Sequence, residues 1–198
     1  TSLIGHVLSH SNISNEVAGN IGRPVLEMSS DTRLDFIVLE LSSYQLELAP
    51  SLACSIAVLL NITPDHLDRH GGMEGYVRAK RRIFDNLSYD PKIIIGTDDE
   101  ITRSICHQFK HQSDFSVIPI SGYQIPENGV GVESGNLRSK LRGIPKCDIN
   151  LNEMKTLIGV HNHQNAAAAI AIALSLGIEQ QEIAVSYTHL RAHETIAD

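Results

Sequence analysis

The segment ELSSYQLE (residues 40–47) places a carboxylate and two hydroxyls where they could do chemistry. Glu40 comes directly after the apolar run Phe36–Leu39, and Ser42 and Ser43 follow it two and three residues later. Carboxylate and hydroxyl oxygens are ligands that Mg²⁺ prefers. The alternative interpretation is a strand-to-helix connection in which one of the two serines caps the next helix.

A second polar cluster, NITPDHLDRH (residues 61–70), follows the apolar run Ser55–Leu60. His66 is a candidate metal ligand or polar contact, and Asp65 and Asp68 are candidates to orient it or to coordinate through water. A lone histidine in such a loop is more often structural. Two polar clusters that end neighbouring strands nevertheless favour a functional site.

Three further segments give weaker signals. Lys80 lies in the basic stretch YVRAKRRIF, which by composition alone predicts a solvent-exposed helix face. The loop GNIG (residues 19–22) has glycines that allow the backbone to approach a ligand closely. In GVHNHQN, Asn162 or Asn165 could cap the following helix or contact a base, and capping is the stronger interpretation for Asn162.

The elements that must position these residues alternate along the chain. The strands are predicted from β-branched apolar runs at Phe36–Leu39, Ser55–Leu60, Lys92–Ile95 and Val117–Ile120. The helices are predicted at Thr1–Ser9, Met73–Leu87, Asp99–Gln108 and His163–Leu176. This alternation predicts an α/β fold with a mostly parallel sheet flanked by helices, in which ligands bind at the carboxyl ends of the strands. The glycine-containing segment between Gly122 and Leu157 predicts a small antiparallel edge sheet.

Composition narrows the class of protein. The 198 residues are 42% hydrophobic, and 16 basic against 23 acidic residues give a net charge of −7, which argues against nucleic-acid binding. No apolar stretch approaches the roughly 20 residues that span a bilayer. Cys54, Cys106 and Cys147 are widely spaced and form no CxxC pair, which favours free thiols in a reducing compartment. We therefore expect a soluble, cytoplasmic protein with no nucleic-acid or membrane partner.

The last residues differ in character from the rest. The stretch VSYTHLRAHET (residues 185–195) looks like the translation of a sequencing adapter, and it has no clean apolar stripe. We therefore predict one domain over residues 1–184 and a non-native tail over 185–198 that packs poorly. A well-buried Tyr187 and Leu190 would contradict that prediction.

Five short sequence motifs together resemble the central, ATP-binding domain of the Mur ligase family, which has a P-loop NTPase-like fold. They occur in the family's order and spacing within residues 1–184: GNIG, ELSSYQLE, NITPDHLDRH, YVRAKRRIF and GVHNHQNAAAA. The first two motifs look most like those of the family member that adds D-glutamate to UDP-N-acetylmuramoyl-L-alanine. The resemblance therefore implies an ATP-dependent amide ligase of peptidoglycan precursor synthesis, with ATP and Mg²⁺ as cofactors.

The resemblance also implies roles for individual residues. Glu40 corresponds to the carboxylate near the Mg²⁺ between the nucleotide phosphates, and His66 to the histidine at a second Mg²⁺ site. Lys80 corresponds to a carbamylated lysine, whose carbamate oxygens are hard metal ligands. The substrate contacts implied are Asn20 and Ser42 at the muramoyl-alanine end, and Asn162 and Asn165 near the adenine.

The chain also departs from the family pattern. The phosphate loop, a Gly-x-x-Gly-Lys-Thr-like turn, is expected immediately before Thr1. The amino- and carboxyl-terminal domains of the family are also absent from the sequence, so we expect the 198 residues alone to be inactive.

Two other functions stay open. One is a related ligase with a different acceptor, such as a diaminopimelate- or lysine-adding ligase or a folylpolyglutamate synthetase-like enzyme. The other is a non-catalytic nucleotide-binding module, which would be favoured if Glu40, His66 and Lys80 lay on separate surfaces.

Overall fold

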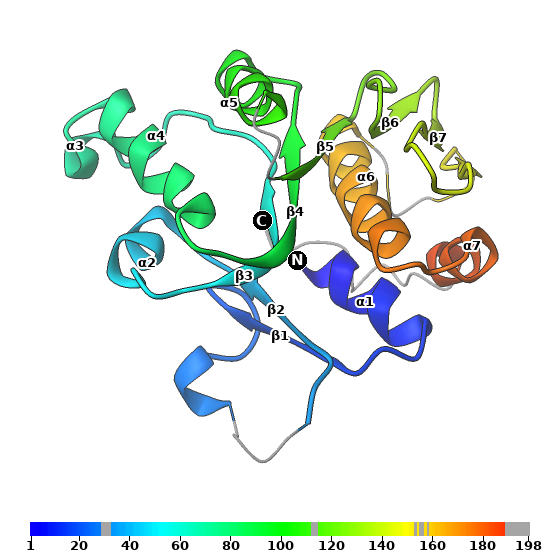
Figure 1. Ribbon diagram of the computed structural model, residues 1–198, viewed down its shortest axis with the longest axis horizontal. Helices are drawn as coiled ribbons and strands as arrows, with labels where there is room; N and C mark the ends of the chain where they lie inside the picture. The colour runs from blue at the N-terminus through cyan, green and yellow to red at the C-terminus, as the bar shows by residue number, and fades with distance from the viewer. Residues whose placement is uncertain (29–32, 112–114, 153, 155–156, 158, 189–198) are drawn as a thin grey trace.

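Parallel strands form the centre of the molecule (Figure 1). The computed structural model describes residues 1–28, 33–111, 115–152, 154, 157 and 159–188. The larger sheet has six strands in sequential order, β3 (Cys54–Leu59), β4 (Leu87–Gly96), β5 (Ser116–Ser121), β6 (Val130–Glu133), β7 (Asn136–Ser139) and β8 (Asp148–Asn150). Its pairing is parallel from β3 to β6 and antiparallel from β6 to β8. A second sheet pairs β1 (Asn15–Gly19) and β2 (Phe36–Glu40) in parallel.

Helices cover the larger sheet on both sides. They are α1 (Ser2–His10), α2 (Ser43–Leu48), α3 (Leu67–His70), α4 (Met73–Arg81), α5 (Glu100–Lys110), α6 (Val160–Ser175) and α7 (Gln180–Thr188). Two 3-10 turns add Val25–Glu27 and Arg82–Phe84. Within the described ranges, no helix combines the length and the apolar character needed to cross a membrane.

The alternation of side chains along β4 divides the core into two layers. Ile93 and Ile95 face the core beneath α4 and α5, whereas Ile94 faces the core shared with α1 and α6. All three isoleucines are fully buried, as expected for a strand covered on both faces. Figure 1 shows α1 and α6 together on one side of the sheet and α5 apart from them. The small alanine side chains of α6 allow this helix to pack closely against β4, β5 and β6.

The predicted α/β architecture is confirmed. Each of the four predicted strands is present, and the predicted antiparallel edge is formed by β6, β7 and β8. The predicted helix over Met73–Leu87 is wrong at its end, because α4 stops at Arg81 and Leu87 begins β4. The sequence analysis also missed β1, whose five residues include only two aliphatic side chains.

The prediction that the chain packs poorly from Val185 onward is wrong for the residues of α7. Tyr187 is 2% exposed within the same core as α1 and α6, and its hydroxyl donates a hydrogen bond to the Ala166 carbonyl at 3.1 Å. Ser186 is fully buried. Leu190 lies outside the described residues. Ile183, Ser186 and Tyr187 are therefore buried in the domain, and this packing extends past the predicted boundary at 184.

Replacing Tyr187 tests how much the packing of α7 contributes to the stability of the domain. We expect Tyr187→Ala to lower the free energy of unfolding by about 3–5 kcal/mol, because it empties a large buried volume. Tyr89 is fully exposed, so the matched control Tyr89→Ala should change it by no more than about 0.5 kcal/mol. Urea denaturation followed by circular dichroism measures both. Equal effects would contradict the packing of α7.

Candidate functional site

Glu40 ends β2 at the carboxyl edge, where it meets the GNIG loop. Gly19 pairs with Glu40 in the β1–β2 ladder, and a side chain at Gly19 would collide with the Glu40 carbonyl. The Asn20 amide N–H donates to that carbonyl at 2.9 Å, and its side-chain Nδ2 lies 3.5 Å from Oε1 of the Glu40 carboxylate. Thr1 Oγ1 donates to Oε2 at 3.2 Å. Asn20 and Glu40, both predicted from the sequence, therefore lie in one place.

Ser42 caps α2. Its hydroxyl accepts a hydrogen bond from the Gln45 amide at 3.3 Å, and the Gln45 side chain accepts one from the Ser42 amide at 2.9 Å. This reciprocal capping box satisfies two amides that would otherwise lack partners. The capping interpretation of the sequence is therefore confirmed for Ser42. The cap also fixes where α2 starts relative to Glu40.

His66 and Asp65 lie in the loop between β3 and α3. His66 has a left-handed backbone (φ 49°), and its Nε2 lies 3.4 Å from Oδ2 of Asp65. The His66 ring centre is 5.2 Å from that of Tyr44 on α2. About half of each of the His66 and Asp65 side chains is exposed, so both groups are accessible to a ligand.

Lys80 reaches the same region from α4. The side chain is half-buried, and its Nζ lies 5.8 Å from the centre of the Tyr76 ring. Burial lowers the pKa of the Lys80 ammonium, although the nearby carboxylates of Glu40 and Asp65 act in the opposite direction. The electrostatic influence of both carboxylates on Lys80 indicates that they lie near it. Composition alone had predicted an exposed basic face here, and that interpretation is wrong for Lys80.

The three candidates Glu40, His66 and Lys80 therefore converge. Lys80 interacts electrostatically with Glu40 and Asp65, and Asp65 contacts His66. Within the described ranges, no group of three or more histidine, cysteine, aspartate or glutamate side chains could hold a metal ion.

The sequence analysis did not identify a buried histidine that joins α2 to α4. The His70 side chain is 1% exposed, its Nε2 is hydrogen-bonded to Ser43 Oγ at 3.0 Å, and its Nδ1 lies 3.5 Å from a carboxylate oxygen of Glu47. Its ring stacks on Tyr44, with centres 5.4 Å apart, and is tilted against Tyr76 at 5.5 Å. No local spacing reveals this cluster, because its members come from three separate segments.

Asn162 and Asn165 lie in the first turns of α6 and are half-buried. The N-cap residue of this helix is Gly159, so the capping interpretation of Asn162 is wrong. Both asparagines lie near the N-terminal end of α6, on a different element from Glu40 and Lys80.

Asp98 holds the start of α6 against the sheet. Its carboxylate accepts hydrogen bonds from Gln164 Nε2 at 3.0 Å, the Gly122 amide at 2.8 Å and Ser121 Oγ at 2.5 Å. Ser121 is the last residue of β5. The first turns of α6 are therefore held at the carboxyl edge.

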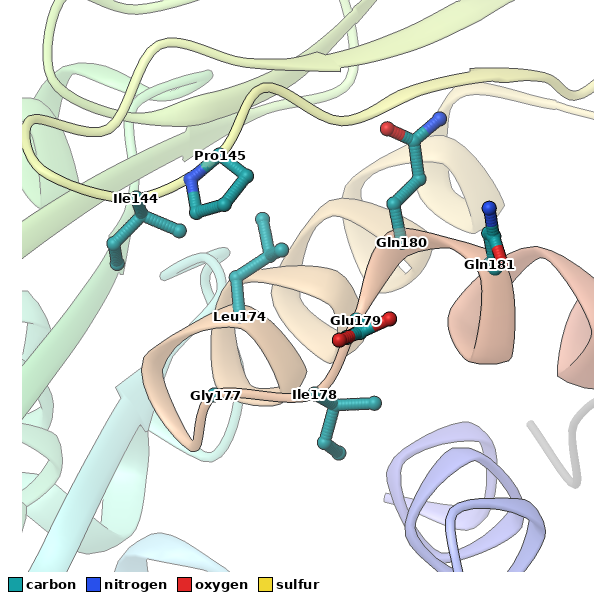
Figure 2. Close-up of a pocket in the computed structure, with 8 residues that line it drawn as sticks. All are labelled: Ile144, Pro145, Leu174, Gly177, Ile178, Glu179, Gln180 and Gln181. Carbon is teal, nitrogen blue, oxygen red and sulfur yellow. The ribbon is translucent and has the colours of Figure 1, made fainter.

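A pocket of about 440 Å³ lies at the opposite end of α6 (Figure 2). It is lined by Ile144, Pro145, Leu174, Gly177, Ile178, Glu179, Gln180 and Gln181. Figure 2 shows Leu174 pointing toward Pro145 and Ile144. None of the predicted site residues lines this pocket, so we do not assign the candidate site to it.

Comparison with known proteins decides the family. The family model described as the Mur ligase middle domain matches residues 2–173. The chain belongs to the Mur ligase family. It is 44% identical over 183 residues to the UDP-N-acetylmuramoylalanine–D-glutamate ligase of Rhodospirillum rubrum, covering 92% of this chain and 38% of that protein. The ligase of the same name from Caulobacter vibrioides is 44% identical over 184 residues, covering 92% and 39%. The chain thus spans about two fifths of the length of these relatives.

Solved Mur ligases share the fold. A UDP-N-acetylmuramoyl-L-alanyl-D-glutamate–2,6-diaminopimelate ligase superposes with a TM-score of 0.67 at 22% identity, covering 96% of this chain and 43% of that one. MurF from Acinetobacter baumannii gives a TM-score of 0.64 at 21% identity, with 96% and 43% coverage. At such identities the likeness shows the common fold of the family.

The role of His70 can be separated from that of His66. We expect His70→Gln to lower the free energy of unfolding by about 1–3 kcal/mol, because Ser43 and Glu47 lose a buried partner. The exposed control His66→Gln should change it by about 0.5 kcal/mol or less. Urea denaturation at neutral pH tests this, and indistinguishable midpoints would contradict the connecting role of His70.

The electrostatics of Lys80 predict a pH dependence. The lowered pKa means that the unfolded chain binds more protons than the folded chain between that pKa and 10.5, so the contribution of Lys80 to stability rises with pH there. We expect NMR titration of the Lys80 side chain to give a pKa below 10.5. Glu40→Gln should lower it further, because it removes a carboxylate that raises it. A Lys80 pKa at or above 10.5 in the folded chain would contradict this.

Proposed function

We propose that this chain is the ATP-binding part of a ligase that joins D-glutamate to UDP-N-acetylmuramoyl-L-alanine. The observation that carries the proposal is the convergence of Glu40, the Asp65–His66 pair and Lys80 at the carboxyl edge. The D-glutamate specificity is supported by relatives that are 44% identical and carry that ligase's name. Convergence also argues against a module without catalytic machinery.

The side chains fit a hard cation such as Mg²⁺ if Lys80 is carbamylated. Burial favours the neutral amine of Lys80, which is the form that reacts with CO₂. The resulting carbamate has two anionic oxygens, and together with Glu40 and His66 it could hold the cation. A bound Mg²⁺ would neutralise charge on the phosphoryl oxygens of ATP. Support for ATP includes a Mur ligase structure, the MurF ligase of Thermotoga maritima, described as a complex with ADP.

The proposed reaction has two steps. The terminal alanine carboxylate of the substrate attacks the γ-phosphorus of ATP, which forms an acyl phosphate and releases ADP. The amine of D-glutamate then attacks the acyl carbon, and phosphate leaves as the amide forms. Catalysis of such steps depends mostly on positioning and electrostatic stabilisation.

The resemblance to the family suggests roles for four further residues. Asn20 lies beside Glu40 and Ser42 follows it by two residues, and we assign both to the muramoyl-alanine end of the substrate. Asn162 and Asn165 at the start of α6 are assigned to the adenine. The phosphate-binding loop that the family resemblance places before Thr1 would then open α1 beside the Glu40 carboxylate.

A chimeric ligase tests the proposal. Residues 1–184 of this chain would replace the aligned segment of the Caulobacter vibrioides relative, and phosphate release would be measured with ATP, Mg²⁺ and UDP-N-acetylmuramoyl-L-alanine. We expect activity with D-glutamate but not with L-lysine or diaminopimelate. Lys80→Met and Glu40→Gln should each reduce kcat by about 100-fold or more, because each removes charge that acts on the transition state.

Arg78→Met provides the matched control, because Arg78 lies on the same helix and its side chain is 74% exposed. This variant should keep kcat within about twofold. Preference for another acceptor would refute the D-glutamate assignment. Full activity of Lys80→Met would refute the proposed role of the lysine.

A further inference from the structure

A pair of histidines on α5 lies outside the candidate site. His107 is in the last turn of the helix and His111 is its C-cap residue, so the two are four residues apart on one face. Their Nε2 atoms are 3.3 Å apart, and their ring centres are 4.5 Å apart. Both residues are exposed to solvent.

We propose that His107 and His111 chelate a transition-metal dication of the Ni²⁺, Cu²⁺ or Zn²⁺ class. Two histidines at i and i+4 on a helix can bind one ion together. With metal–nitrogen bonds of about 2.0–2.1 Å, two ligands at the tetrahedral angle are about 3.3–3.4 Å apart. The observed separation matches this ligand spacing, and water would complete the coordination.

Among the residues that the structure describes, the two other histidine pairs with the same spacing differ in what their rings contact. On α1, His6 Nε2 is hydrogen-bonded to the Ser186 carbonyl at 2.8 Å, and His10 Nδ1 to the His6 carbonyl at 3.1 Å. In the pair formed by His66 and His70, the second ring is buried. The ring–ring contact of His107 and His111 instead brings their two Nε2 atoms together in solvent.

The surroundings determine which ions the pair accepts. Lys110 on the same helix carries positive charge, which weakens simple electrostatic attraction of a cation. Binding must therefore come from the imidazole nitrogens, which suit Zn²⁺, Cu²⁺ and Ni²⁺, whereas Mg²⁺ prefers oxygen ligands. This chemistry separates the pair from the carboxylate site around Glu40.

The test is titration of the full 198-residue chain, carrying no affinity tag, with Ni²⁺ by isothermal calorimetry in the presence of excess Mg²⁺. We expect His107→Gln and His111→Gln each to weaken binding at the α5 site at least about tenfold, because each leaves a single imidazole. His10→Gln is the matched control and should leave this affinity unchanged. Both substituted residues on α5 are exposed, and circular dichroism confirms that the variants fold.

NMR locates the ion. Paramagnetic Ni²⁺ should broaden the amide signals in the last turn of α5 at the lowest concentrations, and neither α5 variant should show this broadening. Broadening centred elsewhere, unchanged affinity in both α5 variants, or displacement of Ni²⁺ by Mg²⁺ would overturn the proposal.

Discussion

Parallel pairing between β3, β4 and β5 brings the carboxyl ends of these three strands to one edge. In the smaller sheet, β1 and β2 are also parallel, so their carboxyl ends lie side by side. The interiors of the strands are buried, whereas the backbone groups and loops at their carboxyl ends are accessible. Glu40 and the loop with Asp65 and His66 therefore emerge where a ligand can reach them. The two-sided burial of β4 makes this arrangement rigid, because each of its central isoleucines is enclosed by a helical layer.

Two polar groups, the half-buried carboxylate of Asp98 and the buried imidazole of His70, hold the helices that flank this edge. Asp98 accepts three hydrogen bonds and holds the start of α6, whereas His70, the last residue of α3, contacts α2 through Ser43 and Glu47 and α4 through the Tyr76 ring. A buried polar group that loses its partners is destabilising, so each arrangement is strongly specified. The positions of Asn165 and Lys80 follow from these contacts, since each residue lies on a helix that one of the two groups holds.

The chain presents two different kinds of donor. Carboxylates and a lysine with a lowered pKa gather at the edge, and they favour hard cations once oxygen ligands are supplied. Two imidazoles stand together on α5, and they favour borderline transition metals. As proposed, the two sites would bind different classes of ion.

The sequence by itself determined the α/β class, most strands and helices, and the residues with chemistry at strand ends, because these depend on local apolar runs and on residue type. It also predicted a serine cap at Ser42 or Ser43, and the hydrogen bond with Gln45 selects Ser42. Only the tertiary structure decided that Lys80 is half-buried near Glu40 and Asp65, that His70 is enclosed, and that Tyr187 belongs to the core. Each of these depends on contacts between segments far apart in the chain, and burial and electrostatic interaction arise only when folding brings those segments together.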